Sequence, residues 1–279
     1  MKLRFPLVLA VAALAAPAFA QFESPQPSPK ATLTQRVGLT DVTLSYSRPS
    51  VNGRAIWGAL VPLDKPWRTG ANAATTITFS DDVTVEGQKL AAGTYSIFTI
   101  PGKAEWTVIF NNDAKLWGET DYDAAKDALR VKVKPQAAEM LETLHIGFPS
   151  IGATSAVLAI EWEKLRVPVT VGVDVDAKIR KSVAAAETAS WQAPMMAARY
   201  WFDAKTNKEE AWKLLEKSIA TNKNYVNVSR KARVLADEGK VAEAVKFGDE
   251  ALALAKADPA KPNVTAFEKT VGEWKAKGK

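Results

Sequence analysis

The fold is decided by the stretch "TYSIFTIPGKAEWTVIF", residues 94–110. Its two halves, 94–100 and 106–110, are rich in β-branched and aromatic residues, which favour extended strands. The segment 101–105 between them contains Gly102, a residue type that readily adopts a positive φ, so this segment predicts the turn of a hairpin. The stretch therefore predicts two antiparallel strands joined by a short loop.

The same strand pattern recurs on both sides of this hairpin. Clusters of Gly, Pro, Asn or Asp separate the segments, and no long helical pattern intervenes. Such a series of short strands is typical of an antiparallel sandwich or barrel. We therefore expect an all-β sandwich over residues 31–174. The further predicted strands are 42–47, 75–80, 129–133, 143–148, 155–162 and 167–173.

After Asp174 the strand pattern stops, and residues 175–279 predict an α-helical domain. Apolar residues recur at helical spacing, as in Trp212, Leu215 and Ile219. Small residues repeat at equal distance, since Ala211 precedes Ala244 by 244 − 211 = 33 positions. A repeat of about 34 residues is typical of tetratricopeptide helical hairpins. The region predicts either degenerate tetratricopeptide-like repeats or an ordinary stack of helical hairpins.

The N-terminus predicts export. Lys2 and Arg4 precede an apolar run at 5–16, and small residues follow at 18–20, which is the pattern of a secretory signal peptide spanning residues 1–20. Residues 21–30 are rich in proline and predict an extended linker. The apolar run is shorter than the roughly 20 residues that span a bilayer. We expect a periplasmic or secreted protein, cleaved near Ala20, with no membrane span in the mature chain.

The charge distribution argues against a nucleic-acid partner. Residues 21–174 carry 15 Lys and Arg against 17 Asp and Glu, whereas residues 175–279 carry 20 against 14. The basic surplus is spread along helices of mixed charge, which indicates a solvated face instead of a nucleic-acid patch. The chain contains no cysteine, so disulfides and cysteine metal sites are excluded.

The common catalytic signatures are missing. No G-x-S-x-G, P-loop, G-x-G-x-x-G or H-E-x-x-H motif occurs, and His145 is the only histidine. In the predicted strand 143–148 this residue alternates with apolar neighbours, so we expect it at the surface or between domains. Oxygen ligands between Asn111 and Asp127 lack the spacing of a calcium loop, and turn formation explains them. We therefore predict no metal and no cofactor.

The connection at 48–75 carries the candidate site. It is far longer than the roughly 12 to 15 residues beyond which a loop is usually functional or disordered. Its tryptophans are too apolar to stay solvated, so it must fold onto the sandwich. Arginine forks suit carboxylate, phosphate or sulfate, and indole faces suit sugar rings. The same residues could instead brace the loop against carbonyls and close the sandwich. The candidate ligand-binding residues are Arg48, Arg54, Trp57, Trp67, Arg68 and Asn72.

Several motifs carry a family resemblance. They include Arg48-Pro49, Gly53-Arg54, Trp57-Gly58, "WRTGAN" at 67–72 and "AGTY" at 92–95. With these motifs, residues 29–173 strongly resemble the bacterial family catalogued as domain of unknown function 2911. The resemblance implies an exported envelope protein, sometimes with helical repeats after the β domain. It implies no catalytic residues.

Together these features favour a non-catalytic binding module of the cell envelope. The Arg/Trp-rich loop would bind a glycan or a small anionic ligand, and the helices would contact a protein partner or pack on the sandwich. One alternative is a carbohydrate-active hydrolase with carboxylates beside the loop. The other is a purely structural scaffold.

Overall fold

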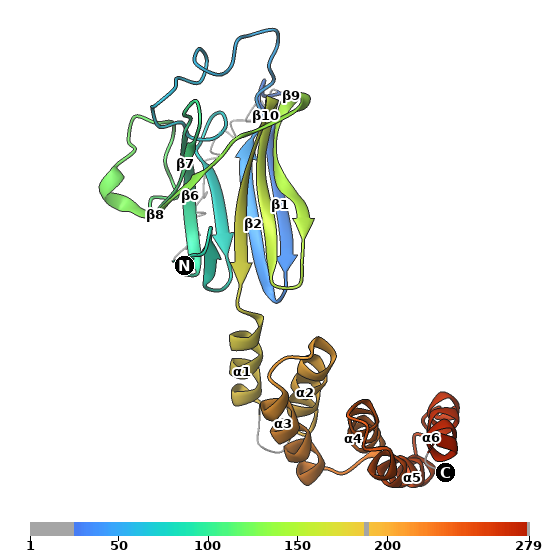
Figure 1. Cartoon of the computed structure of the whole chain (residues 1–279). Coiled ribbons are helices and arrows are strands. Elements are labelled where there is room, and N and C mark those ends of the chain that lie inside the picture. The colour runs from blue at the N-terminus through green and yellow to red at the C-terminus, as the bar shows by residue number, and fades with distance from the viewer. Residues whose placement is uncertain (1–24, 187–189, 278–279) are drawn as a thin grey trace, which may run out of the picture.

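The computed structural model describes residues 25–186 and 190–277. The predicted signal peptide and residues 21–24 of the predicted linker lie outside the described residues. The described residues form ten strands in two antiparallel sheets, and six α-helices follow beyond one end of the sheets (Figure 1). The predicted all-β domain followed by a helical region is confirmed.

The larger sheet has six strands in the order β1-β2-β3-β6-β7-β8, and the smaller has four in the order β5-β4-β10-β9. The hairpin predicted from 94–110 is β6 paired with β7, with Phe98 opposite Ile109. The strands are β1 (Lys30–Val37), β2 (Thr40–Ser47), β3 (Thr75–Phe79), β4 (Val83–Val85), β5 (Gln88–Leu90), β6 (Gly93–Ile100), β7 (Trp106–Asn111), β8 (Asp127–Val133), β9 (Gln136–Ile151) and β10 (Ser155–Val173).

The two sheets form a sandwich because they share one apolar core. Leu44, Ile77 and Ile97 of the larger sheet and Leu144 and Val169 of the smaller sheet are fully buried in a single cluster. Burying a side chain of this size stabilises the fold by about 1.5–3 kcal/mol. Residues of β1, β2 and β3 alternate between more buried and more exposed positions because one face of the sheet meets this core.

A second, smaller core covers the outer face of the larger sheet. Phe98 and Ile109 point away from the main core and are nonetheless fully buried, together with Ala74 and Leu116. Leu116 belongs to the segment between β7 and β8, which includes the short helix η1 (Ala124–Lys126) capped by Asp123. This segment therefore lies over the sheet, and it explains why β6 is apolar on both faces.

The prediction for residues 155–173 is wrong in one respect. Residues 155–162 and 167–173, predicted as two strands, form the single strand β10. Glu163 has a φ of 55°, and a register shift at this residue absorbs the irregularity without ending the strand. Pro168 lies between the part of β10 that pairs with β9, up to Arg166, and the part that pairs with β4, from Val171. Its missing N–H therefore costs no pairing with either strand.

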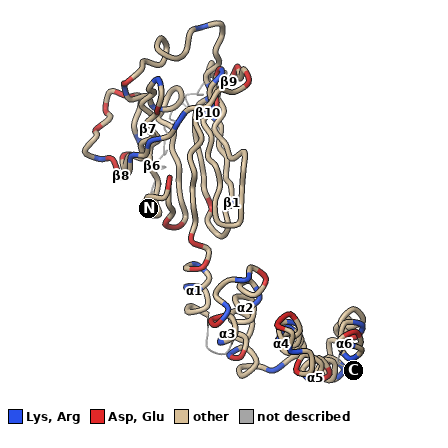
Figure 2. The backbone as a smooth tube through the Cα atoms, in the orientation of Figure 1, with Lys and Arg blue, Asp and Glu red and all other residues tan. Residues whose placement is uncertain are grey.

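Short connections at 205–207, 222–224, 238–240 and 258–264 separate the helices from α2 to α6. Small residues at corresponding positions, Ala211 and Ser218 on α3 and Ala244 and Ala251 on α5, are all fully buried, so these helices pack closely there. A tetratricopeptide ancestry stays a prediction. Charges of both signs alternate along this region (Figure 2). The helices are α1 (Val175–Ala185), α2 (Gln192–Ala204), α3 (Lys208–Thr221), α4 (Tyr225–Asp237), α5 (Val241–Ala257) and α6 (Thr265–Lys277).

Helix α1 connects the sandwich to the helices. Val175 is buried in the sandwich core, and Lys178 donates hydrogen bonds to the Leu39 carbonyl and to Asp81. On its other side, Asp176 accepts hydrogen bonds from the Trp201 indole at 2.8 Å and from the Asn207 amide at 2.7 Å. Both halves of the chain are thus anchored to one helix. Within the described residues, no helix is long and apolar enough to cross a membrane.

Candidate functional site

The connection between β2 and β3, residues 48–74, is fixed to both sheets by backbone hydrogen bonds. Val51 donates to the Glu142 carbonyl of β9 at 2.8 Å, and Trp67 and Thr99 of β6 exchange two bonds of 2.8 Å. Because these bonds join the loop to two strands that belong to different sheets, the loop closes one end of the sandwich. Its order therefore comes from pairing as well as from buried indoles.

Three of the predicted site residues donate hydrogen bonds that brace the loop. Arg48 donates from Nε to the Leu144 carbonyl at 2.9 Å. Arg54 donates from Nε and Nη2 to the carbonyls of Val51 and Ser50. Asn72, with a φ of 59°, donates from Nδ2 to the Ser28 carbonyl and to Ser47 Oγ. Most of these bonds satisfy backbone carbonyls, some of them in the loop and one, that of Leu144, in β9.

The two tryptophans of the loop belong to a cluster of four. Trp67 stacks on Trp162 of β10 with centroids 5.9 Å apart, and Trp57 meets Trp106 of β7 edge-on at 5.0 Å. The Trp67 indole N–H donates to the Gly70 carbonyl at 3.2 Å, whereas the buried Trp57 Nε1 has no hydrogen-bond partner among the described residues. Stacked and edge-on pairs of this kind each contribute about 0.5–1.5 kcal/mol beyond area burial.

Arg68 differs from the bracing arginines because it pairs with an acid. Its Nη1 lies 2.6 and 2.7 Å from the two carboxylate oxygens of Glu119, and its backbone N–H also donates to Glu119. Its Nε is buried and has no hydrogen-bond partner among the described residues. Glu119 lies on the segment between β7 and β8, so this pair joins that segment to the loop.

A pocket of about 440 Å³ lies beside this pair. It brings together three of the six predicted site residues, Arg54, Trp67 and Arg68, while Arg48, Trp57 and Asn72 do not line it. Its charged side chains are Arg54, Lys65, Arg68 and Glu119, a net charge of 3 − 1 = +2. The rest of the wall is largely apolar and includes Leu60, Val61, Pro62, Pro66, Ala71 and Trp162.

The pocket residues that were not among the predicted site residues include Lys65, Glu119 and Trp162. Lys65 sits inside the same loop, next to a proline, and nothing in its local pattern distinguishes it from a solvated lysine. Glu119 was considered only as an oxygen ligand for a cation. Trp162 lies 162 − 74 = 88 residues beyond the end of the loop in sequence and reaches the pocket because β10 runs beneath it. Only the tertiary contacts reveal these three.

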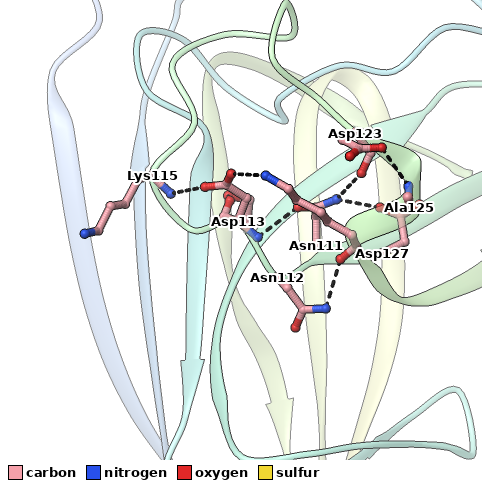
Figure 3. A network of polar contacts seen from close by, with 9 residues as sticks. Asn111, Asn112, Asp113, Lys115, Asp123, Ala125 and Asp127 are labelled. Carbon is pink, nitrogen blue, oxygen red and sulfur yellow. Dashed lines mark hydrogen bonds and ion pairs between the residues drawn. The ribbon is translucent and has the colours of Figure 1, made fainter.

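The acidic segment from Asn111 to Asp127 forms a hydrogen-bonded network (Figure 3). Asn111 donates to Asp127 at 2.8 Å and to the Asp123 carbonyl at 2.9 Å. Lys126 lies 2.9 Å from Asp113 and lowers the pKa of that carboxyl. Burial together with the neighbouring Asp127 raises the pKa of Tyr122 to about 12. These carboxylates hold protein donors, and the described residues contain no group of three His, Cys, Asp or Glu placed to hold a metal.

Fold and site together define an antiparallel β-sandwich closed at one end by an Arg/Trp-rich loop and followed by helices. The family described as "Protein of unknown function (DUF2911)" matches residues 28–171, more than half of the chain, and the chain belongs to that family. The resemblance seen in the sequence is thereby confirmed. The comparisons with curated proteins and with solved structures gave no match.

Proposed function

We propose that the protein is a non-catalytic, exported binding module whose Arg54/Lys65/Arg68 pocket holds an oxyanion attached to an apolar body. The observation that carries this proposal is the pocket itself, in which three cationic side chains and one carboxylate line an otherwise apolar wall. A net positive charge at a partly desolvated wall attracts carboxylate, phosphate or sulfate groups. The apolar wall suits the remainder of the ligand.

The cationic groups retain donors for such a ligand. Among the described residues, Lys65 Nζ, Arg54 Nη1 and Arg68 Nη2 make no hydrogen bond to a protein acceptor. Arg68 already donates to one carboxylate, that of Glu119, and carboxylates and similar oxyanions are the groups that a guanidinium binds. The pocket therefore supports a ligand anion beside Glu119.

The packing of the indoles favours a small anion over a glycan. Trp67 is 6 % exposed and Trp162 is 1 % exposed, and the two rings stack on each other. A sugar ring needs an open aromatic face, and these faces are covered. The half-buried Trp57 does not line the pocket.

The carboxylates of the pocket favour binding over glycoside hydrolysis. Glu119 is the only acid among its described lining residues. Glycosidases generally use two carboxylates separated by about 5–9.5 Å. A purely structural role accounts well for Arg48 and Asn72, and we accordingly assign ligand binding only to Arg54, Lys65 and Arg68.

Titration calorimetry on the mature chain tests the proposal with three probes that share one apolar body, hexyl phosphate, sodium hexanoate and hexylammonium chloride. We expect the two anions to bind and the cation to bind weakly at this pocket. Lys65→Gln should weaken anion binding by about two- to fivefold, as loss of a partly solvated charge pair does. Lys89→Gln on β5 is the matched control, because Lys89 is exposed and does not line the pocket.

Equal anion affinity in wild-type protein and Lys65→Gln, or no anion binding at all, would overturn the pocket assignment. An Arg68→Gln variant that remains folded but loses anion binding would support it further. Export is tested separately by determining the N-terminus of the mature protein, which we expect at Gln21. A protein partner for the helices remains part of the proposal and is tested by pull-down with residues 175–279 deleted.

A further inference from the structure

A larger groove, of about 660 Å³, lies on the outer face of the smaller sheet. The residues 136–141 of β9 form one wall, and the side chains of His145, Glu161, Leu165 and Arg166 contribute the rest. The inner face of the same two strands carries core residues such as Leu144 and Trp162. This groove is therefore separate from the Arg54/Lys65/Arg68 pocket.

The groove follows from the pairing of β9 with β10. Glu161 is opposite His145, Glu163 is opposite Leu141, and Leu165 is opposite Ala137. From one of these pairs to the next, the chain advances by four residues in β9 but by only two in β10. The surplus residues cannot stay in the ladder, so β9 bulges away from its partner at this end.

A polar group of three side chains lies in this groove. Glu161 accepts from Arg166 Nε at 2.6 Å on one carboxylate oxygen and lies 3.2 Å from His145 Nδ1 on the other. A neutral imidazole bears a proton on only one nitrogen, and the carboxylate places that proton on Nδ1. Nε2 of His145 is then a hydrogen-bond acceptor.

Gly147 provides the space for this imidazole. A Cβ at Gly147 would lie 2.7 Å from His145 Cε1 and 3.0 Å from Nε2, so any side chain there would displace the ring. The His145 ring thus lies over Gly147, which has no side chain to displace it, and Glu161 orients the ring. Its side chain is 44 % exposed, which leaves the ring accessible from the groove.

The remaining polar groups of the groove are mainly acceptors. Glu161 neutralises Arg166, and Glu139 adds an exposed carboxylate, giving two carboxylates and one guanidinium, a net charge of 1 − 2 = −1 with His145 neutral. Leu141, Leu165 and the half-exposed Met140 provide an apolar surface beside them. The net charge of the groove is therefore opposite in sign to that of the Arg54/Lys65/Arg68 pocket.

From this arrangement we propose that the groove is a second ligand site, which binds a small amine in its protonated form. The ammonium group donates to Glu139 and to His145 Nε2, and the hydrocarbon part lies along Met140, Leu141 and Leu165. The site does not depend on the anion pocket, because no side chain lines both.

The single histidine allows a selective experiment. In mature protein without a polyhistidine tag, the imidazole ring proton signals in NMR spectra belong to His145 alone and report on this groove. Hexylammonium chloride, sodium hexanoate and 1-hexanol are titrated in turn at constant pH and ionic strength. We expect hexylammonium to shift the ring signals saturably and hexanoate to leave them in place.

Glu139→Gln removes the exposed carboxylate and should raise the dissociation constant of hexylammonium by about two- to fivefold, the factor that a partly solvated ion pair contributes. Glu273→Gln, on an exposed position of α6, is the matched control and should bind as the wild-type protein does. Equal shifts with hexanoate and hexylammonium, no shift with hexylammonium, or an unchanged dissociation constant in Glu139→Gln would each overturn the proposal.

Discussion

Glu161 and Trp162 are neighbours on β10, yet their side chains line different pockets on opposite faces of the strand. Glu161 pairs with His145 and Arg166 on the outer face, and Trp162 stacks on Trp67 on the inner face. The two sites are separated by one strand because successive side chains of a strand point in opposite directions. One continuous strand, which the sequence predicted as two, therefore supports both sites.

The segment between β7 and β8, which covers the outer face of the larger sheet, should be essential for stability. Leu116→Ala removes a side chain that is 7 % exposed and packed on Phe98 and Ile109. We expect a loss of about 2–5 kcal/mol in the free energy of unfolding, because the segment cannot collapse fully onto the vacated space. The neighbouring Trp117 is 69 % exposed, and Trp117→Ala should change stability by no more than about 0.5 kcal/mol. Urea denaturation measures the free energy of unfolding of both variants. Similar losses in the two would contradict the prediction that Leu116 stabilises the fold by covering the sheet.

The pair of Arg68 and Glu119 should contribute little to stability. Both side chains are partly exposed, at 27 % and 36 %, so solvent screens their attraction. A double-mutant cycle with Arg68→Gln and Glu119→Gln should give a coupling energy of about 0.2–1 kcal/mol in urea denaturation. A coupling energy several times larger would indicate that the pair mainly stabilises the fold. That result would weaken the assignment of Arg68 to ligand binding.

Helix packing should weaken in acid through Glu238. The hydrogen bond from Lys240, with further donors from Lys208 and the Trp212 indole, outweighs burial and lowers the pKa of Glu238 from 4.5 to about 2. A carboxyl whose pKa is lower in the folded state stabilises the fold fully above its unfolded value, and this contribution is lost as the pH falls through the folded value. Stability should therefore decline between about pH 4.5 and 2.

Glu238→Gln tests this dependence. The variant should be less stable than the wild-type protein at pH 6, and the difference should shrink at pH 3, as measured by the urea midpoint of helical circular dichroism. Glu268→Gln on α6 is the control and should leave the pH profile unchanged. A constant difference between wild-type protein and Glu238→Gln across this range would contradict the assignment.

Gly147 should be required for the position of His145. Gly147→Ala places a Cβ within 3.0 Å of the imidazole, so the ring must move and the bond to Glu161 must lengthen or break. We expect the His145 ring signals to shift and their response to hexylammonium to be lost. The fold should survive, because a surface side chain moves instead of the backbone. Gly272→Ala, where nothing lies within 4 Å of the added Cβ, should leave the His145 signals unchanged.

Much of the fold was predictable from local pattern. The hairpin at 94–110 and the switch from strands to helices after Asp174 both appear in the structure where composition and spacing placed them. Local steric preferences and the period of apolar residues carry this information. The split of β10 was wrong because the charged stretch 163–166 interrupts the apolar pattern, whereas the strand continues through a register shift at Glu163.

The candidate site was predictable only in part. Arg54, Trp67 and Arg68 meet in one pocket, whereas Arg48 and Asn72 hold carbonyls and Trp57 packs in the tryptophan cluster. The residue types in the loop indicated which chemistry was available. They did not indicate which side chains converge, because that depends on the path of the loop over β6 and β9.

The sequence by itself determined the class of fold, its order along the chain and its membership of a family, because these follow from periodicity, turn residues and motifs that are local in the chain. The tertiary structure alone decided which charges meet. It paired Glu119 with Arg68 and stacked Trp162 on Trp67. It also placed His145 in a different pocket from these residues. Such contacts join residues far apart in sequence, and their positions follow from strand register and from the packing of two sheets around one core.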